Sequence, residues 1–249
     1  MKKLRVDRIL ANLGYASRAE AKILVARHRV RVNGEIVTKP EQLADPLALT
    51  LDNEPLDRPA GILAMLHKPV DVVCSHDERE GIRIYDLVPE RWLLRNPQVI
   101  SAGRLDKDSS GLVLITDDYA LVHRVTSPKH HVKKVYEVSV DGEITPEIVT
   151  KFASGELLMA TDPVPCRPAQ VETTGPTTAL VTLTEGRNRQ LRRMFAACGL
   201  TVESLHRISF GSVVLGDLPE GQWLDVDGPV VDAPGPDQRT ADGGAPTSD

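Results

Sequence analysis

The densest group of reactive side chains lies between Gly103 and Gly111, in the sequence Gly-Arg-Leu-Asp-Lys-Asp-Ser-Ser-Gly. This segment directly precedes the apolar run Leu112–Ile115, which is typical of a buried strand. Polar groups on a loop that a rigid element anchors are a common catalytic arrangement. Composition alone favours the simpler interpretation, a polar turn in which Asp106 or Asp108 caps backbone amides.

A second polar group combines arginines with a predicted helix over Gln190–Cys198. Leu191, Met194, Phe195 and Cys198 would form its apolar face. Arginines bind phosphate oxygens, and one of them could also orient a buried carboxylate through a two-point bond. We therefore predict a functional role for the four arginines of this segment, Arg187, Arg189, Arg192 and Arg193.

Two further carboxylates, Asp117 and Asp118, follow the same apolar run. Together with Asp106 and Asp108 they could form a magnesium site. The favoured interpretation is that Asp118 caps a helix that begins near Tyr119. No histidine pair has the spacing of a metal-binding motif, so we assign no metal ligand.

The distribution of charge points to an anionic partner. The whole chain of 249 residues has a formal net charge of -5. Residues 1–39, however, carry ten Lys and Arg against three Asp and Glu, a net +7, whereas residues 216–249 carry eight acids against one Arg, a net -7. A basic segment of this kind is typical of a nucleic-acid-binding surface, with a solvated charged surface as the alternative.

The elements predicted within this basic segment would present its cations together. Val6, Ile9 and Leu10 have helical spacing, and Ser17-Arg-Ala-Glu20 has the pattern of a capping box that starts a second helix. The alternation in 29–32, followed by Asn-Gly, predicts a hairpin. The residues of this segment that we predict to bind nucleic acid or another anionic partner are Arg8, Ser17, Arg18, Lys22, Arg27, Arg29 and Arg31.

The remaining pattern predicts an α+β protein of four parts: an N-terminal domain over 1–46, a linker over 47–61, a catalytic domain over 62–231 and a disordered acidic tail over 232–249. The predicted strands include Ile62–Leu66, Asp71–Cys74, Val99–Ile100, Leu112–Ile115, Val135–Val140 and Thr178–Leu183. Three widely spaced cysteines exclude a disulfide framework, and no run is long and apolar enough to span a membrane or to form a signal peptide. We therefore expect a cytoplasmic protein with no membrane contact.

Motifs in both predicted domains resemble known families. Val6-Asp-Arg-Ile-Leu, Ser17-Arg-Ala-Glu-Ala and Arg31-Val-Asn-Gly resemble the S4 RNA-binding domain. Gly-Arg-Leu-Asp106, Lys-Lys-Val-Tyr136 and Glu185-Gly-Arg…Gln-Leu-Arg192 resemble the motifs of pseudouridine synthases. The family commonly has Tyr-His where this chain has Asn188-Arg189. An S4 domain ahead of the catalytic domain is the arrangement of the ribosomal pseudouridine synthases.

The resemblance implies a fold, a reaction and roles for four residues. The catalytic domain would have a mixed, mainly antiparallel sheet with flanking helices. Asp106 would be the essential carboxylate, Arg192 its ion-pair partner, and Tyr136 the residue that lines the uracil pocket. Arg104 would hold the backbone of a nucleotide flipped out of its stack. The reaction imports no group and involves no redox change, so no cofactor is expected.

The resemblance also implies ribosomal RNA as the partner, and we expect the protein to act on it as a monomer. Shorter segments of the chain look most like the small-subunit members of the family. They favour 16S rRNA in an assembly intermediate as the substrate, with uridine 516 as the target. Three alternatives stay open on the sequence alone: a uridine of 23S rRNA, a non-catalytic S4-type assembly factor, and a metal-dependent phosphohydrolase built on the four aspartates.

Overall fold

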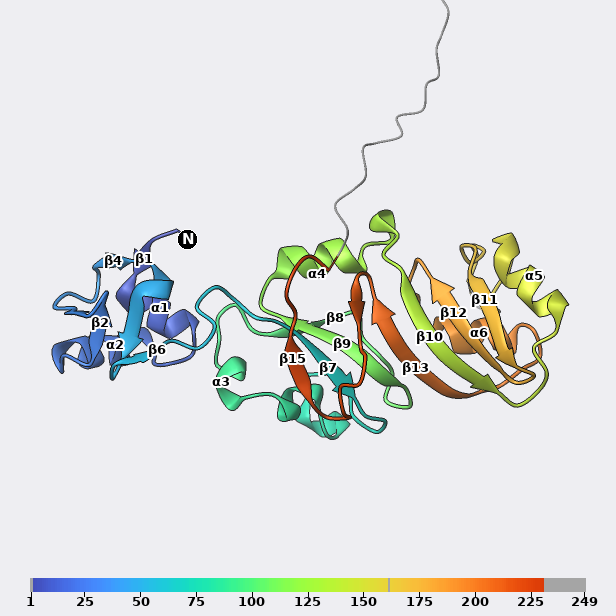
Figure 1. Ribbon diagram of the computed structural model, residues 1–249, viewed down its shortest axis with the longest axis horizontal. Coiled ribbons are helices and arrows are strands. Elements are labelled where there is room, and N and C mark those ends of the chain that lie inside the picture. Colours follow the sequence, from blue (N-terminus) through green and yellow to red (C-terminus); the bar gives the residue numbers. More distant parts are fainter. Residues whose placement is uncertain (1, 161, 231–249) are drawn as a thin grey trace, which may run out of the picture.

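The N-terminal domain begins with two short helices, α1 (Val6–Asn12) and α2 (Arg18–Ala26). The predicted capping box at the start of α2 is confirmed, because the Ser17 hydroxyl accepts a hydrogen bond from the Glu20 backbone N–H and the Glu20 carboxylate accepts one from the Ser17 N–H. Val6, Ile9 and Leu10 are buried, as their spacing predicts. The computed structural model describes residues 2–160 and 162–230 of the chain (Figure 1).

The predicted hairpin forms β2 (Val30–Val32) and β3 (Glu35–Ile36). Strands β5 (Leu49–Leu51) and β6 (Glu54–Pro55) extend this sheet in the order β3-β2-β5-β6, and β1 (Leu4–Arg5) pairs with β4 (Leu43–Ala44). The predicted linker over 47–61 is therefore wrong in its first part. Leu49 and Leu56 are buried in the N-terminal core, and those strands are too short to show a clear alternation in the sequence.

The connection that remains, residues 57–61, is held against the second domain. The Arg58 guanidinium lies 4.8 Å from the ring centroid of Trp92 and 4.9 Å from that of Trp223. It also forms ion pairs with Asp57 and Asp225, and the Trp92 indole N–H donates to Asp57. These aromatic and ionic contacts fix the connection in place.

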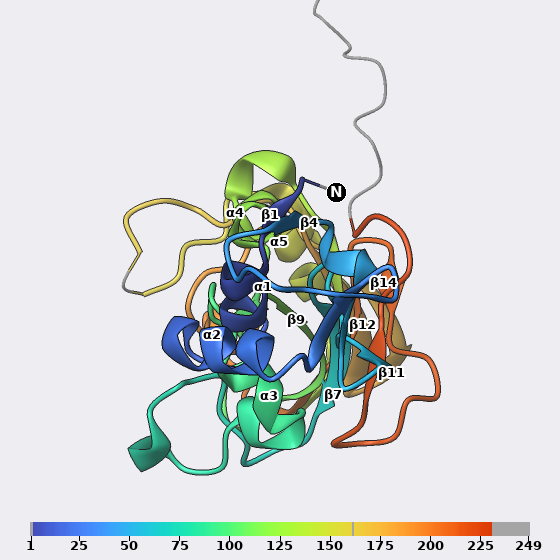
Figure 2. The same ribbon diagram turned by 90° about the vertical axis from the view of Figure 1, so that its left-hand side faces the viewer.

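The two domains also contact each other directly. The Tyr15 hydroxyl accepts a hydrogen bond of 2.7 Å from the Asp57 N–H, and the Arg91 guanidinium lies 4.2 Å from the centre of the Tyr15 ring. The Asn96 N–H donates to the Asn12 carbonyl at 2.8 Å. Figure 2 views the molecule from the N-terminal domain, which lies in front of the larger sheet.

The second domain is built on a nine-stranded sheet whose main path has the order β11-β12-β10-β13-β9-β7-β15, while β14 pairs with β13 and β8 with β9. Every pairing is antiparallel except that of β13 with β9. This confirms the predicted mixed, mainly antiparallel sheet. The strands are β7 (Leu63–Lys68), β8 (Ile100–Ala102), β9 (Ser110–Thr116), β10 (Lys134–Val140), β11 (Gln170–Gly175), β12 (Thr178–Leu183), β13 (Val202–Phe210), β14 (Val213–Val214) and β15 (Trp223–Asp225).

Helices pack on both faces of this sheet. On one face, Leu112 and Leu114 of β9 share a buried cluster with α4 (Tyr119–Thr126). On the other face, Val113 and Ile115 belong to the main core, which also contains residues of α3 (Glu90–Leu93), α5 (Pro146–Ser154) and α6 (Gln190–Ala196). None of the helices in the described ranges is long and apolar enough to cross a membrane.

One prediction for this domain is wrong, and another concerns residues that the structure does not describe. The run Asp71–Cys74 is not a strand, because only Val73 forms an isolated bridge, to Arg83. Residues 232–249, predicted to be a disordered tail, lie outside the described residues. The helix predicted over Gln190–Cys198 is present and ends at Ala196.

Candidate active site

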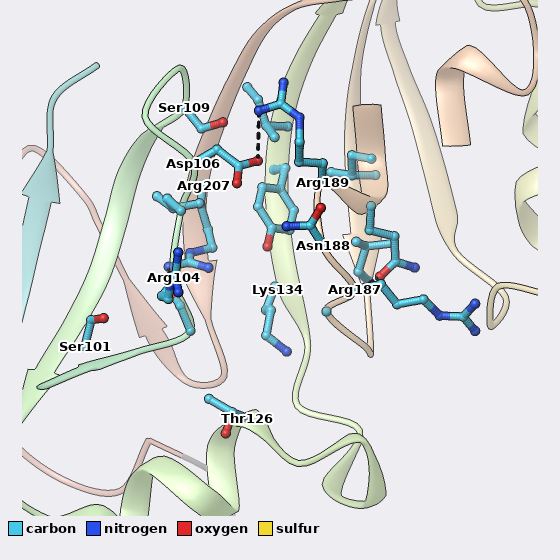
Figure 3. A pocket seen from close by; sticks show the side chains of 18 residues that line it. Ser101, Arg104, Asp106, Ser109, Thr126, Lys134, Arg187, Asn188, Arg189 and Arg207 are labelled. Atoms are coloured by element: carbon cyan, nitrogen blue, oxygen red, sulfur yellow. Dashed lines mark hydrogen bonds and ion pairs between the residues drawn. The ribbon is translucent and has the colours of Figure 1, made fainter. Parts of the chain in front are cut away.

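The segment Gly103–Gly111 connects β8 to β9 and forms one wall of a cavity of about 450 Å³ (Figure 3). It is supported from beneath by Lys68, which is fully buried and donates to the Ser109 carbonyl at 2.6 Å and to the Pro69 carbonyl at 2.7 Å. Burial lowers the pKa of the Lys68 ammonium. The loop is thus attached to rigid structure, as its position before a buried strand predicts.

Position 111 requires glycine for two reasons: its backbone conformation, and the close approach of the Arg207 backbone. Its φ is +106°, and a Cβ atom there would lie 2.3 Å from the carbonyl oxygen of Arg207 on β13. Any side chain would therefore separate β9 from β13 at the parallel pairing that closes the cavity.

We expect Gly111→Ala to lower the free energy of unfolding by at least about 2 kcal/mol, because strained backbone alone costs on the order of 1–3 kcal/mol. Urea unfolding measures the effect. Gly186→Ala is the matched control, since a Cβ at Gly186 meets nothing within 4 Å. Equal stability of the two variants would contradict the close approach at Gly111.

The Asp106 carboxylate points into this cavity and is 31% exposed. The cation nearest to it is Arg189, whose Nη1 lies 3.9 Å from Oδ2 of Asp106 (Figure 3). Arg189 also donates to Asp108 at 2.9 Å. Although partial burial raises the pKa of Asp108, the hydrogen bond from Arg189 and the charge of Arg192 lower it to a net value below the usual range.

The predicted pair between Arg192 and Asp106 is therefore wrong. Arg192 donates to the Asp108 carbonyl and to the Val202 carbonyl, both at 2.9 Å, and lies 3.2 Å from the Asp108 carboxylate. The reason is the start of α6. Arg189 precedes the helix in a left-handed conformation, with a φ of +48°, and this conformation directs its side chain toward Asp106. Arg192 lies in the first turn of the helix and reaches the neighbouring part of the loop.

Tyr136 and Arg104 both line the cavity, as predicted. Tyr136 lies on β10 and is 8% exposed. Arg104 is exposed, and its guanidinium has no hydrogen-bond or ion-pair partner among residues 2–160 and 162–230. Arg104 is therefore available for a ligand, whereas Tyr136 presents a ring on the cavity wall.

Sequence reasoning missed two cations at the cavity, Arg207 and Lys134. Arg207 is 1% exposed, and it donates to the Leu112 carbonyl at 2.7 Å and to the Gly103 carbonyl at 2.6 Å. Lys134 is 6% exposed and donates to the Val132 carbonyl at 3.0 Å. No sequence signal marked Arg207. Lys134 stands two residues before Tyr136, and strand alternation places both on one face.

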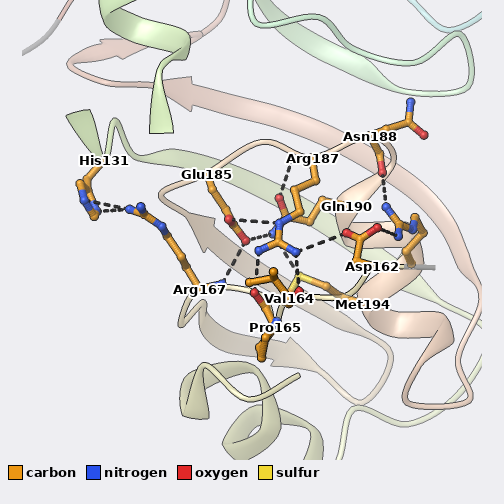
Figure 4. A network of polar contacts seen from close by, with 11 residues as sticks. His131, Asp162, Val164, Pro165, Arg167, Glu185, Arg187, Asn188, Gln190 and Met194 are labelled. Carbon is orange, nitrogen blue, oxygen red and sulfur yellow. Dashed lines mark hydrogen bonds and ion pairs between the residues drawn. The ribbon is translucent and has the colours of Figure 1, made fainter. Parts of the chain in front are cut away.

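The two other arginines of the α6 segment, Arg187 and Arg193, bind residues of the segment 162–165 (Figure 4). Arg187 donates to the carbonyls of Val164 and Pro165 and forms ion pairs with Glu185 and Asp162. Arg193 also forms an ion pair with Asp162. RNA contacts of Arg187, Arg189 and Arg193 stay a prediction, because the observed contacts of all three side chains are with the protein.

The predicted RNA-binding residues of the N-terminal domain differ in their contacts. Ser17 is the helix cap, so its hydroxyl is already used. Arg18 lies 3.7 Å from the buried Asp7 carboxylate, Arg29 pairs with Asp52, and Arg31 donates to the Gly34 carbonyl. Exposed side chains at this domain's surface include Arg8, Lys22 and Arg27.

Asp117 and Asp118 have structural roles. Asp118 accepts hydrogen bonds from the N–H groups of Ala120 and Leu121, which confirms the predicted cap of α4. Asp117 accepts from the Ile62 N–H and pairs with the buried Arg95. Among residues 2–160 and 162–230 there is no group of three or more His, Cys, Asp or Glu that could hold a metal ion.

Comparison with known proteins places these features in a family. Residues 4–46 match the model of the S4 domain, and residues 62–197 match that of RNA pseudouridylate synthase. Relatives named ribosomal small subunit pseudouridine synthase A are 36% identical in Vibrio parahaemolyticus, over 87% of this chain and 93% of the relative, and 36% identical in Escherichia coli, over 88% and 95%.

A solved structure supports the same placement. A crystal structure of a pseudouridylate synthase is 34% identical, covers 90% of this chain and 96% of its own, and superimposes with a TM-score of 0.63. Fold, domain order and sequence therefore agree with one another. The chain belongs to the RNA pseudouridylate synthase family and is a pseudouridine synthase, an isomerase with an S4 domain ahead of its catalytic domain.

Proposed function

We propose that this protein converts uridine 516 of 16S ribosomal RNA to pseudouridine, with Asp106 as the catalytic carboxylate. The observation that carries the role of Asp106 is its position: an ionisable oxygen faces a cavity of about 450 Å³ whose other walls carry Tyr136 and several cations. The names of the two relatives support a small-subunit RNA as substrate.

The reaction breaks the N1–C1′ glycosidic bond, turns the uracil and joins C5 to C1′. C5 then loses its proton, and N1 gains one. The target base first leaves its stack, at a cost of a few kcal/mol. Asp106 then attacks or stabilises C1′, or adds to the base, and Arg189 keeps a positive charge beside the ionised carboxylate. Tyr136 packs against the uracil, and Arg104 binds the backbone of the flipped nucleotide.

We also infer that the substrate is RNA in an assembly intermediate of the small subunit, in the cytoplasm, because a flipped base is most accessible before the particle is complete. The direct test is tritium release from 16S rRNA that carries C5-labelled uridine, free or in immature particles. Release from 23S rRNA alone would overturn the proposed target.

The charge of the N-terminal domain should appear in the salt dependence of RNA binding. We expect the double substitution Arg8→Gln and Lys22→Gln to reduce the slope of log K against log salt by about 0.7–0.9 for each phosphate that is no longer neutralised. Filter binding at several salt concentrations measures the slope. Substitution is preferred to deletion, because Tyr15 and Asn12 contact the catalytic domain. Lys151→Gln on α5 is the control, and equal slopes for both proteins would exclude phosphate binding at Arg8 and Lys22.

A further inference from the structure

Two buried cations lie together at the base of the cavity. Lys134 of β10 is paired in register with Phe210 of β13, and its Nζ lies 4.9 Å from the centre of the Phe210 ring. The Arg207 guanidinium lies 5.2 Å from the same ring. Two positive charges therefore lie near one aromatic ring and line one cavity.

Neither cation is balanced by a carboxylate within the described residues. Arg207 donates to two backbone carbonyls, and Lys134 donates to one. An ammonium carries three donors, so Lys134 has unused hydrogen-bonding capacity. Burying an unpaired charge is costly, and proteins retain such groups mainly at sites where a ligand supplies the opposite charge. The pair thus marks a position for negative charge.

The surroundings show which part of a substrate would carry that charge. Tyr136 follows Lys134 by two residues on β10 and faces the same cavity. It is paired in register with Arg207, whose guanidinium lies 5.9 Å from the Tyr136 ring. A pyrimidine packed on Tyr136 would therefore lie in a cavity that both cations line.

We propose that Lys134 is a further catalytic residue, which with Arg207 binds the oxygens of the pyrimidine and stabilises the negative charge that forms on it. This inference rests on the proposed function. When the N1–C1′ bond breaks, its electron pair passes to N1 and spreads over the ring oxygens. If Asp106 instead adds to C6, the electron pair of the C5–C6 double bond moves toward the C4 oxygen as an enolate. Both routes place a charge where a buried cation stabilises it.

The protonation of Lys134 gives this role a measurable signature. Burial and the neighbouring charge of Arg207 lower the pKa of Lys134 to about 8. The ammonium is therefore charged at pH 7 and loses its proton as the pH rises through about 8. The other charged or titratable groups that face the cavity are Arg104, Asp106, Arg187, Arg189, Tyr136 and Arg207.

The test is the single-turnover rate of tritium release from C5-labelled 16S rRNA between pH 6 and pH 9.5, with the full-length protein. We expect Lys134→Met to lower the rate at pH 7 by about 100-fold, as loss of one donor to a developing oxyanion does. The wild-type rate should fall above about pH 8, and this fall should be absent in Lys134→Met. RNA affinity should change little, and Lys151→Met on exposed α5 should behave as wild type in rate and pH profile.

Thermal unfolding separates this role from a structural one. Removing an unpaired buried charge should leave the melting temperature of Lys134→Met equal to or above that of the wild type. A lower melting temperature together with an unchanged pH profile would overturn the inference, as would a wild-type rate in Lys134→Met. A wild-type protein that releases no tritium from any ribosomal RNA would instead remove the proposed function and, with it, this role for Lys134.

Discussion

Asp106→Asn is expected to abolish pseudouridine formation, with a fall in rate of at least about 10⁴-fold, as when an enzyme loses its nucleophile. An amide has almost the same size as a carboxylate but cannot act as a nucleophile or base. The Asp106 side chain faces the cavity and is 31% exposed, so its replacement should leave the core unaffected. RNA affinity and melting temperature should therefore stay close to those of the wild type.

The same substitution at Asp108 is the matched control. Asp108 lies in the same loop and pairs with Arg189 and Arg192, but its side chain is 47% exposed. An ion pair of this exposure contributes up to about 1 kcal/mol, so Asp108→Asn should cost no more than about tenfold in rate. Tritium release and RNA binding measure both variants. Substantial turnover by Asp106→Asn, or a larger loss in Asp108→Asn, would assign the chemistry to a different carboxylate.

Arg189→Met is expected to lower the rate at pH 7 by more than about tenfold. Arg189 is the cation nearest to Asp106, with its Nη1 3.9 Å from Oδ2 of the carboxylate, and it is placed to orient that group. Without it the carboxylate loses this neighbour, so the loss should appear in the single-turnover rate of tritium release. Arg189→Lys keeps the charge and should recover part of the rate.

Arg192→Met distinguishes this arrangement from the one that the family motif predicts. Arg192 is 14% exposed and joins the loop to the end of strand β13 through the carbonyls of Asp108 and Val202. Its removal should therefore lower the melting temperature more than the removal of Arg189 does. A much larger loss of rate in Arg192→Met than in Arg189→Met, with the melting temperature unchanged, would restore Arg192 as the partner of Asp106.

Local patterns predicted the local elements of this protein. The capping box at Ser17 and Glu20, the hairpin around Asn33-Gly34 and the cap at Asp118 each depend on residues only a few positions apart. The buried strand that follows the Asp106 loop was also predictable from its apolar run. The residues of the loop alone favoured a polar turn, and only the resemblance to a family marked Asp106 as a site residue.

Features that depend on distant pairings could not be predicted in the same way. Strand β13 reads as Val-Glu-Ser-Leu-His-Arg-Ile-Ser-Phe, and only its pairing with β9 and β10 shows that Arg207 is buried. Helical periodicity placed the apolar face of α6 correctly. It could not describe Arg189, which adopts a left-handed conformation before the helix starts, and this conformation determines which arginine reaches Asp106.

The contacts around Arg58 have a mechanical consequence for substrate choice. A flexible tether would let the S4 domain search a wide volume, and the benefit of a second binding surface would depend on tether length. Here the contacts of Arg58 with Trp92 and Trp223 and the Tyr15 hydrogen bond remove that freedom. The S4 domain and the cavity of the catalytic domain are therefore held at a fixed separation. RNA that reaches both of them at this separation loses little additional entropy, whereas RNA with another spacing binds only one of them. Distance along the folded RNA thereby becomes part of what this enzyme recognises.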